Sequence, residues 1–175
     1  MTSLLDDNLL ANIRLVAFDV DGVFTDGRFY LSNDGVESKA FSTQDGYGVR
    51  QVLLAGIEVA VISGRRSAAV QQRMDELGVR HVIQGCSDKI AVFEALTKEL
   101  GITDAECIYV GDDVPDLPLL GKAGISVAVA NAVAEVRELS DYTTQARGGF
   151  GAVREVCDLL LRARTGLNER SERYS

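Results

Sequence analysis

Short apolar runs alternate with longer amphipathic segments along most of this chain. Four of the runs are rich in Val, Ile, Leu and Ala, which is typical of strands buried on both faces. They cover residues 13–18, 58–62, 107–110 and 125–130, and a weaker strand is expected at 79–83. A further strand is expected at the sheet edge, at 142–144. Strands that alternate with helices in this way predict βαβ units and a parallel sheet.

Helices are predicted where apolar residues recur at helical spacing between the strands. A short helix is expected within the first dozen residues, and a longer one opens at Gly46–Gly48 and ends before Gly56. Ser87 is the expected N-cap of a helix that runs to Leu100. The remaining helices are expected at 67–77, 114–120, 133–139 and 153–164.

Two segments depart from this alternation. Residues 28–31 and 36–41 flank the turn formers Ser32–Gly35, which predicts a β-hairpin inserted after the first strand, at about 28–41. From Thr165 onward the chain is polar and has no apolar period. We therefore expect a single domain over residues 1–165, followed by a mobile C-terminal tail at 166–175.

Composition narrows the class of protein. The 175 residues are 46% hydrophobic and 25% charged, as in soluble globular proteins, and the formal net charge is −8. An acidic chain of this kind repels nucleic acid and anionic membrane surfaces, so neither is an expected partner. We find no apolar run long enough to span a bilayer and no signal peptide.

Cysteine and histidine usage argues against disulfides and zinc. Cys86, Cys107 and Cys157 are few, odd in number and far apart, which favours reduced thiols and a cytoplasmic location. The only histidine, His81, has no Cys or His cluster around it, so no zinc site is expected.

Polar residues gather where several predicted strands end. Because loops after parallel strands open on one edge of the sheet, these residues are expected to converge. They are Asp19 and Asp21 after the first strand, Ser63 after the second, Lys89 at a helix start, and Asp112, Asp113 and Asp116 after a later strand. Crowded carboxylates repel one another unless a cation neutralises them, and an oxygen-only ligand set favours magnesium. A hydroxyl and an ammonium beside them suit a phosphate.

These residues form four motifs in chain order: the Asp19–Asp21 pair, Ser63, Lys89 and the acidic group at 112–116. In this order they resemble the motifs of the haloacid dehalogenase superfamily of phosphohydrolases. Within that superfamily, the sequence specifically resembles the small sugar-acid phosphatases that lack a cap domain. Four stretches carry it: residues 19–27 (DVDGVFTDG), 44–48 (QDGYG), 62–65 (ISGR) and 148–155 (GGFGAVRE). It implies an α/β, Rossmann-like three-layer sandwich with a central parallel sheet, the hairpin as its insertion, and no cap domain.

The resemblance also implies roles in catalysis and metal binding. Asp19 would be the nucleophile and a magnesium ligand, and Asp21 the general acid and base, with its backbone carbonyl on the metal. Asp112 would be the third protein ligand. Asp113 and Asp116 would orient water bound to the metal. A simpler interpretation of the last two is that they are acids at a helix N-terminus, favoured by the helix dipole.

Phosphate and substrate contacts follow from the same resemblance. Ser63, Gly64 and Lys89 would hold the phosphoryl group, although Ser63 could instead be only the N-cap of the next helix. Arg65, Gly46 and Tyr47 are the candidate substrate-binding residues, although Tyr47 could equally be a core or interface aromatic. Arg147 and Arg154 could reach the substrate of a neighbouring subunit.

The implied activity is magnesium-dependent hydrolysis of an octulosonate 8-phosphate through an aspartyl-phosphate, in lipopolysaccharide precursor synthesis. The motifs leave a nonulosonate 9-phosphate open as the substrate. A third hypothesis is a non-catalytic assembly module, although the intact acidic residues argue against it. The resemblance further implies a homotetramer assembled through the hairpin.

Overall fold

The computed structural model describes the backbone of residues 5–173 and the side chains of residues 5–166. Six strands form one sheet in the order β5-β4-β1-β6-β7-β8, and every neighbouring pair is parallel. The strands are β1 Leu15–Phe18, β4 Glu58–Ser63, β5 His81–Gln84, β6 Cys107–Gly111, β7 Ile125–Ala128 and β8 Tyr142–Thr143. The predicted parallel sheet is confirmed, and β8 is the predicted edge strand.

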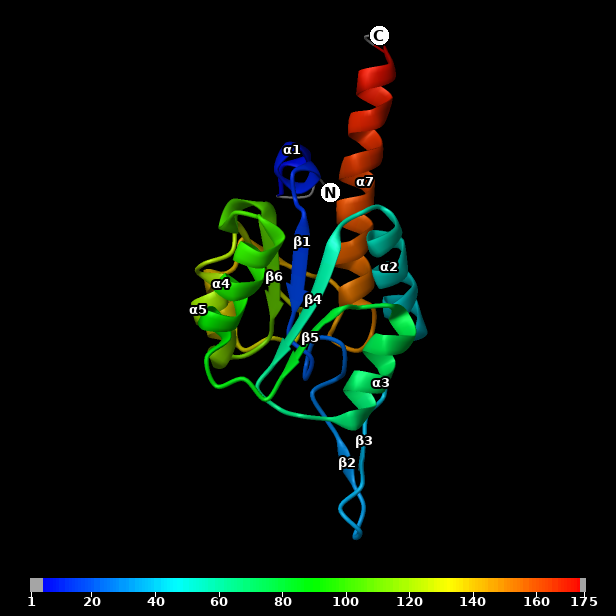
Figure 1. Ribbon diagram of the computed structural model, residues 1–175, viewed down its shortest axis with the longest axis vertical. Coiled ribbons are helices and arrows are strands. Elements are labelled where there is room, and N and C mark those ends of the chain that lie inside the picture. The colour runs from blue at the N-terminus through cyan, green and yellow to red at the C-terminus, as the bar shows by residue number, and fades with distance from the viewer. Residues whose placement is uncertain (1–4, 174–175) are drawn as a thin grey trace.

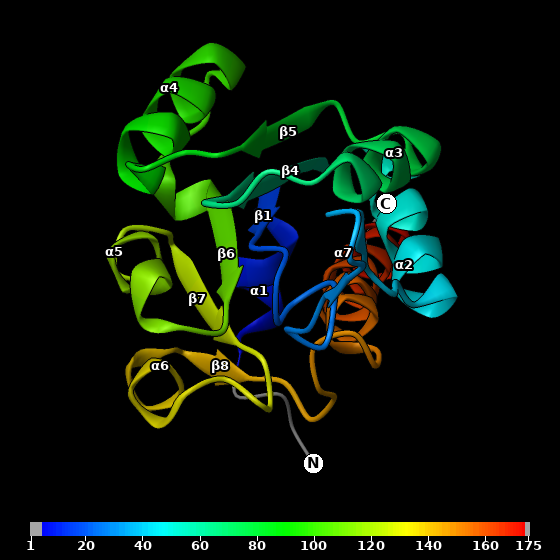
Figure 2. The same cartoon turned by 90° about the horizontal axis from the view of Figure 1, so that it is seen from below.

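The helices cover both faces of the sheet. Figure 2 shows α4, α5 and α6 on one face and α2, α3 and α7 on the other, which gives the three layers expected of the fold. The helices are α1 Asp7–Ala11, α2 Thr43–Leu54, α3 Ala68–Leu77, α4 Lys89–Leu100, α5 Leu117–Leu120, α6 Ala134–Leu139 and α7 Ala152–Arg173, with 3₁₀ turns η1 Asp104–Glu106 and η2 Val114–Asp116. In the described chain, no helix is both long and apolar enough to cross a membrane.

β1 lies at the centre of the sheet because its sequence is apolar on both faces. All four of its residues are buried, and it pairs with β4 on one side and β6 on the other. Phe18 also packs edge-to-face on Phe24, with the ring centroids 5.2 Å apart. The strand therefore fixes the position of the loop that follows it, where Asp19 and Asp21 lie.

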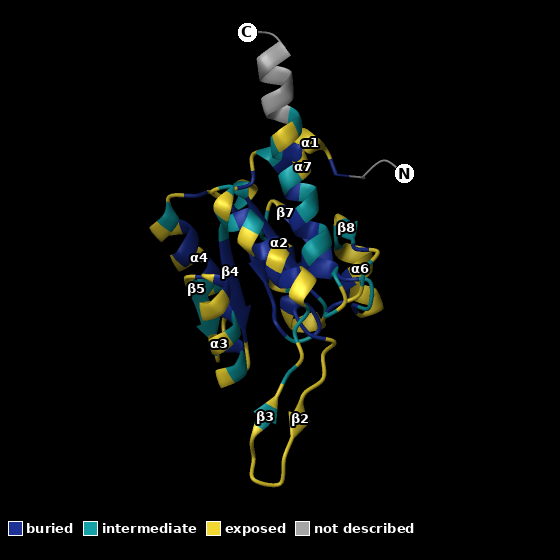
Figure 3. Cartoon of the chain, turned by 90° about the vertical axis from the view of Figure 1, so that its right-hand side faces the viewer, coloured by how far each residue is buried: buried dark blue, intermediate teal, exposed yellow. Residues whose placement is uncertain are grey.

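The hairpin projects from the end of the sheet at which β1 and β4 terminate (Figure 1). Its strands are β2 Tyr30–Leu31 and β3 Glu37–Ser38, which pair antiparallel. Gly35 supplies the positive φ, +78°, that the turn requires. The predicted hairpin is confirmed, and Figure 3 shows most of it exposed in this single chain.

Two predicted helix starts are wrong. α2 begins at Thr43 rather than Gly46, because the Ser42 hydroxyl caps it by accepting from the Asp45 amide. The N-cap of α4 is Asp88 rather than Ser87, since the Asp88 carboxylate accepts from the Ala91 amide at 3.0 Å.

α7 extends to Arg173, well past the predicted end at Arg164. No proline follows Arg164 to stop the helix, and the loss of an apolar period does not by itself end one. The expected tail at 166–175 is therefore helical as far as Arg173, and its last two residues lie outside the described chain. Its mobility stays a prediction.

Candidate active site

A pocket opens at the edge of the sheet where β1, β4 and β6 end. Nine of the residues predicted for the site line it, although they come from four separate stretches of the sequence. They are Asp19, Asp21, Ser63, Gly64, Arg65, Lys89, Asp112, Asp113 and Asp116, and Gly27 and Pro115 also contribute to the wall. The predicted convergence at one edge of a parallel sheet is confirmed.

The loop after β1 is held by its own backbone. The Val20 carbonyl accepts from the amides of Val23, Phe24 and Thr25, at 2.9 to 3.2 Å. The Thr25 hydroxyl in turn accepts from the Gly22 and Gly27 amides at 3.3 and 3.2 Å. These contacts turn the chain sharply after Asp21, so that Asp19 and Asp21 both reach the pocket.

Lys89 is the centre of the charge arrangement. Its Nζ donates to Asp19 Oδ1 at 2.7 Å, to Asp116 Oδ1 at 2.7 Å and to the Tyr109 hydroxyl at 3.2 Å. Burial alone would lower the pKa of Lys89, but the carboxylates of Asp19 and Asp116 outweigh it and raise that pKa. Lys89 is therefore a fixed cation at the pocket floor. Sequence analysis missed Tyr109, because it lies within the apolar run that forms β6 and nothing in its pattern marks it.

Asp116 uses both of its carboxylate oxygens within the protein. Oδ1 accepts from Lys89 and from the Tyr109 hydroxyl, the latter at 2.7 Å, while Oδ2 accepts from the amides of Asp112 and Asp113 at 3.0 and 3.3 Å. Asp113 caps the same turn, since its Oδ1 accepts from the Val114 amide at 2.8 Å. Both acids are thus helix-capping residues, as the simpler interpretation held. An additional role in orienting water stays a prediction.

The donor set fits a hard divalent cation. Carboxylate oxygens of Asp19, Asp112 and Asp116 lie within 4.8 Å of one another. Burial, together with repulsion from Asp19 and Asp116, raises the pKa of Asp112 to about 8. Burial and repulsion from Asp116 raise the pKa of Asp19 to about 6, against the opposing effect of Lys89. Both oxygens of Asp116 accept hydrogen bonds within the protein, so Asp19 and Asp112 stay the predicted magnesium ligands of this set.

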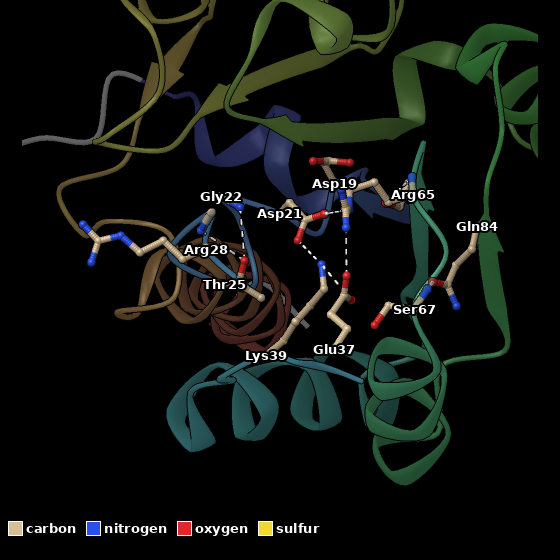
Figure 4. A network of polar contacts seen from close by, with 12 residues as sticks. Asp19, Asp21, Gly22, Thr25, Arg28, Glu37, Lys39, Arg65, Ser67 and Gln84 are labelled. Carbon is tan, nitrogen blue, oxygen red and sulfur yellow. Dashed lines mark hydrogen bonds and ion pairs between the residues drawn. The ribbon is translucent and has the colours of Figure 1, made fainter. Parts of the chain in front are cut away.

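Asp21 lies in a second charged cluster, which Figure 4 shows at the base of the hairpin. Its carboxylate forms an ion pair with Lys39, and Arg65 Nε lies 3.7 Å from the same carboxylate. Arg65 also donates to Glu37 Oε2 at 2.8 Å. Sequence analysis missed Glu37 and Lys39. Their opposite charges at alternate positions were the available signal, but nothing in the sequence shows which face of the hairpin turns toward the site.

Ser63 and Gly64 shape the opposite wall. Ser63 is only 5% exposed, and its carbonyl accepts from the Cys86 amide at 3.2 Å, which joins the ends of β4 and β5. The N-cap of α3 is Ser67, so the interpretation of Ser63 as merely that cap is wrong. The Ser63 hydroxyl lies at the pocket and accepts from the Arg65 amide at 3.3 Å.

The structure does not place Gly46 or Tyr47 in the pocket of their own chain. Gly46 lies in α2 and faces the Arg73 and Leu77 side chains of α3, so a side chain at this position would have to displace the end of Arg73. The Tyr47 ring lies under the Arg154 guanidinium, 5.0 Å from the ring centroid, and is 55% exposed. Both are held away because their turn of α2 faces α3 and α7 rather than the carboxyl edge of the sheet.

Comparison with known proteins agrees with this geometry. The model of the haloacid dehalogenase-like hydrolases matches residues 81–154. The 3-deoxy-D-manno-octulosonate 8-phosphate phosphatase of Escherichia coli K12 is 49% identical over 158 residues, which are 90% of this chain and 84% of that protein.

Two crystal structures are similarly close. The 3-deoxy-D-manno-octulosonate 8-phosphate phosphatase of Yersinia pestis has a TM-score of 0.90 and 44% identity over 93% of this chain and 88% of its own. The Moraxella catarrhalis enzyme, solved with a magnesium ion, a phosphate ion and a KDO molecule, has a TM-score of 0.89 and 43% identity over 97% of each chain. The chain therefore belongs to the haloacid dehalogenase-like hydrolases, in the family of the 3-deoxy-D-manno-octulosonate 8-phosphate phosphatases.

Proposed function

We propose that this protein is a magnesium-dependent phosphatase that hydrolyses 3-deoxy-D-manno-octulosonate 8-phosphate to the free sugar acid and phosphate, in lipopolysaccharide precursor synthesis. The observation that carries the proposal is the contact of Lys89 with both Asp19 and Asp116, opposite Ser63, in one pocket. The Moraxella catarrhalis relative, which holds magnesium, phosphate and KDO together, supports the same substrate and ion.

The first chemical step uses Asp19 and Asp21. A carboxylate oxygen of Asp19 attacks phosphorus, and the bond between phosphorus and the sugar oxygen breaks. Asp21 gives its proton to that departing oxygen, which therefore leaves as a hydroxyl group of the sugar rather than as an alkoxide. Asp19 then carries the phosphoryl group as an aspartyl-phosphate.

The second step regenerates the nucleophile. Asp21, now ionised, takes a proton from a water molecule as that water attacks phosphorus. The bond between phosphorus and Asp19 breaks, inorganic phosphate forms, and Asp21 is left protonated for the next cycle. Both proton transfers require the Asp21 carboxyl group to lie on the side of the phosphorus from which the sugar leaves and the water attacks.

The phosphoryl group itself is held by neutral and cationic donors. Lys89 supplies an ammonium fixed by two carboxylates, Ser63 a hydroxyl, and Gly64 a backbone amide at the same wall. Magnesium, held by Asp19, Asp112 and the Asp21 carbonyl, supplies positive charge that offsets the repulsion between the nucleophilic carboxylate and the phosphate. Arg65 lies beside them at the rim, where it suits the substrate's carboxylate.

We further propose a homotetramer, assembled through the hairpin, that acts in the cytoplasm. Phe29, Tyr30, Leu31 and Val36 are 41 to 69% exposed on this hairpin, which is a large apolar surface for a single chain. The three cysteines are free thiols, as is usual in a reducing compartment.

Phosphate release tests the activity directly. The purified protein is incubated with 3-deoxy-D-manno-octulosonate 8-phosphate, a nonulosonate 9-phosphate and other sugar phosphates, with magnesium or with a chelator. Magnesium-dependent preference for the octulosonate is the expected result. Equal or faster release from the nonulosonate would change the substrate and keep the mechanism. No release from any phosphoester would overturn the proposal in favour of an assembly module.

A further inference from the structure

We propose that Lys39, from the hairpin, is a positioning residue that orients the general acid and base Asp21, and that Glu37 anchors it there. The proposal rests on the proposed function and adds a requirement to it. The hairpin would then be more than an assembly device, because its register would set the geometry of a catalytic carboxylate within the same chain.

Lys39 is buried in a segment that is otherwise exposed. Its side chain is 1% exposed, while Ser38 and Ala40 on either side of it are exposed. A lysine ammonium almost never gives up its hydration unless carboxylates replace the water. Here Asp21 accepts directly from Nζ, and Glu37 Oε1 lies 3.7 Å away. The side chain is therefore directed at the active site rather than into solvent.

Glu37 joins this lysine to the loop after β4. Its Oε2 accepts from Arg65 at 2.8 Å, and the Ser67 hydroxyl faces the same carboxylate (Figure 4). Ser67 lowers the pKa of Glu37 most, with Arg65 and Lys39 adding to the effect. The Phe29 ring lies 4.2 Å from the Arg65 guanidinium carbon, so the other arm of the hairpin contacts the same loop.

The alternation of a β-strand explains why both residues reach the site. Glu37 lies in β3 and Lys39 directly follows its last residue, Ser38. In extended chain, residues two apart project to the same side. A slip of one residue in the hairpin would turn both side chains away together. One register therefore places the Glu37 and Lys39 side chains against two catalytic loops at once.

Without Lys39, Asp21 would keep only the looser contact with Arg65, at 3.7 Å. The Asp21 carboxylate, 23% exposed, could then rotate away from the departing sugar oxygen. Proton transfer depends on a donor within hydrogen-bond reach, so loss of orientation should slow the step that needs the proton and spare a step that does not.

Leaving-group dependence separates this role from a structural one. The variant Lys39→Met keeps the apolar stem and removes the charge. Its kcat/KM, which covers events only up to departure of the leaving group, is compared with wild type on the octulosonate phosphate and on p-nitrophenyl phosphate. We expect a fall of about tenfold to hundredfold on the sugar phosphate, part of the full general-acid effect, and at most about threefold on the aryl ester, whose leaving group needs no proton.

Two variants complete the design. Lys98→Met removes an exposed lysine from α4 and should leave both values unchanged. Lys39→Arg restores a cation and should recover part of the loss on the sugar phosphate. If Lys39→Met does not fold, Lys39→Gln, which keeps a polar group, takes its place in the same comparison.

Equal falls on both substrates, or no fall on either, would overturn the positioning role. These results differ from a failure of the proposed function, in which the wild-type protein itself would release no phosphate from the sugar substrate.

Discussion

The Lys89 ammonium lies 2.7 Å from the Asp19 carboxylate, although 70 residues separate the two in sequence. Asp19 directly follows the central strand β1 and Lys89 begins α4, so two elements must dock correctly before the contact exists. Burial and Asp116 raise the pKa of Asp19, and Lys89 opposes that rise. The contact therefore serves the fold and the chemistry together.

Replacement of Asp19, the proposed nucleophile, should stop the reaction and leave the fold intact. Asp19→Asn keeps the shape of the side chain and one acceptor for Lys89, but an amide cannot form the acyl-phosphate. We expect no measurable phosphate release and a circular dichroism spectrum like that of wild type. Glu99→Gln, an exposed change on α4, is the matched control and should retain full activity. Substantial turnover by Asp19→Asn would exclude this residue as the nucleophile.

Asp116→Asn should cost both stability and activity. Asp116 is 1% exposed and is the second carboxylate partner of Lys89. Replacement by a neutral amide leaves the buried ammonium of Lys89 with one carboxylate partner instead of two. Removal of one member of a buried charged pair lowers the free energy of unfolding by about 3–5 kcal/mol. The asparagine amide keeps some of the hydrogen bonds, so the loss for Asp116→Asn should lie in that range or below it. Urea unfolding measures the loss.

Tyr109→Phe is the milder companion to that variant. It removes only the hydroxyl that donates to Asp116, and should cost about 1 kcal/mol. A larger loss for Tyr109→Phe than for Asp116→Asn would show that the aromatic hydroxyl, not the charge pair, holds this end of the pocket together.

The sequence was sufficient for the sheet, the hairpin and most of the pocket. The apolar run at β1 has one stable place in an α/β fold, and strand ends in such a sheet share an edge. Motif order then pointed to Asp19, Ser63 and Asp112 at the ends of clear strand patterns, and to Lys89 at the start of a clear helix pattern.

The rest depended on tertiary contacts that leave no local trace. Tyr109 looks like any apolar strand residue until Asp116 folds beneath it. Lys39 looks like a solvated hairpin lysine until the hairpin turns its inner face to Asp21. Tyr47 lies outside the pocket of its own chain because α2 turns its ring toward Arg154, which no pattern in the sequence shows. Its role in substrate binding stays a prediction.

Metal-free protein should lose stability as pH rises from 5 to 8. Folding raises the pKa of Asp112 to about 8 and that of Asp19 to about 6, so the folded state holds protons that the unfolded state has already released. An acid with a raised pKa destabilises the fold progressively above its unfolded value near 4, and fully above its folded value. The melting temperature in chelator should therefore fall across this interval.

Magnesium should reverse that trend. Since the ion neutralises the same carboxylates, it should raise the melting temperature more at pH 8 than at pH 5. Asp112→Asn is the control, because it removes the most strongly shifted group and should flatten both the pH dependence and the magnesium effect. A melting temperature in chelator that climbs from pH 5 to pH 8 would contradict the charge repulsion described for this pocket.

Gly22→Ala should weaken magnesium binding through a steric effect on Asp112. A Cβ at position 22 would overlap the Asp112 carboxylate, so that side chain must move, and the φ of +87° adds strain. Gly35→Ala is a matched control, because it has a similar φ of +78° and open space around it. Strain alone should cost each variant about 1–2 kcal/mol in denaturant unfolding. Magnesium titration by calorimetry should then separate them, with weaker binding in Gly22→Ala and wild-type binding in Gly35→Ala. Equal magnesium affinity in the two variants would mean that Asp112 does not need its present position to hold the ion.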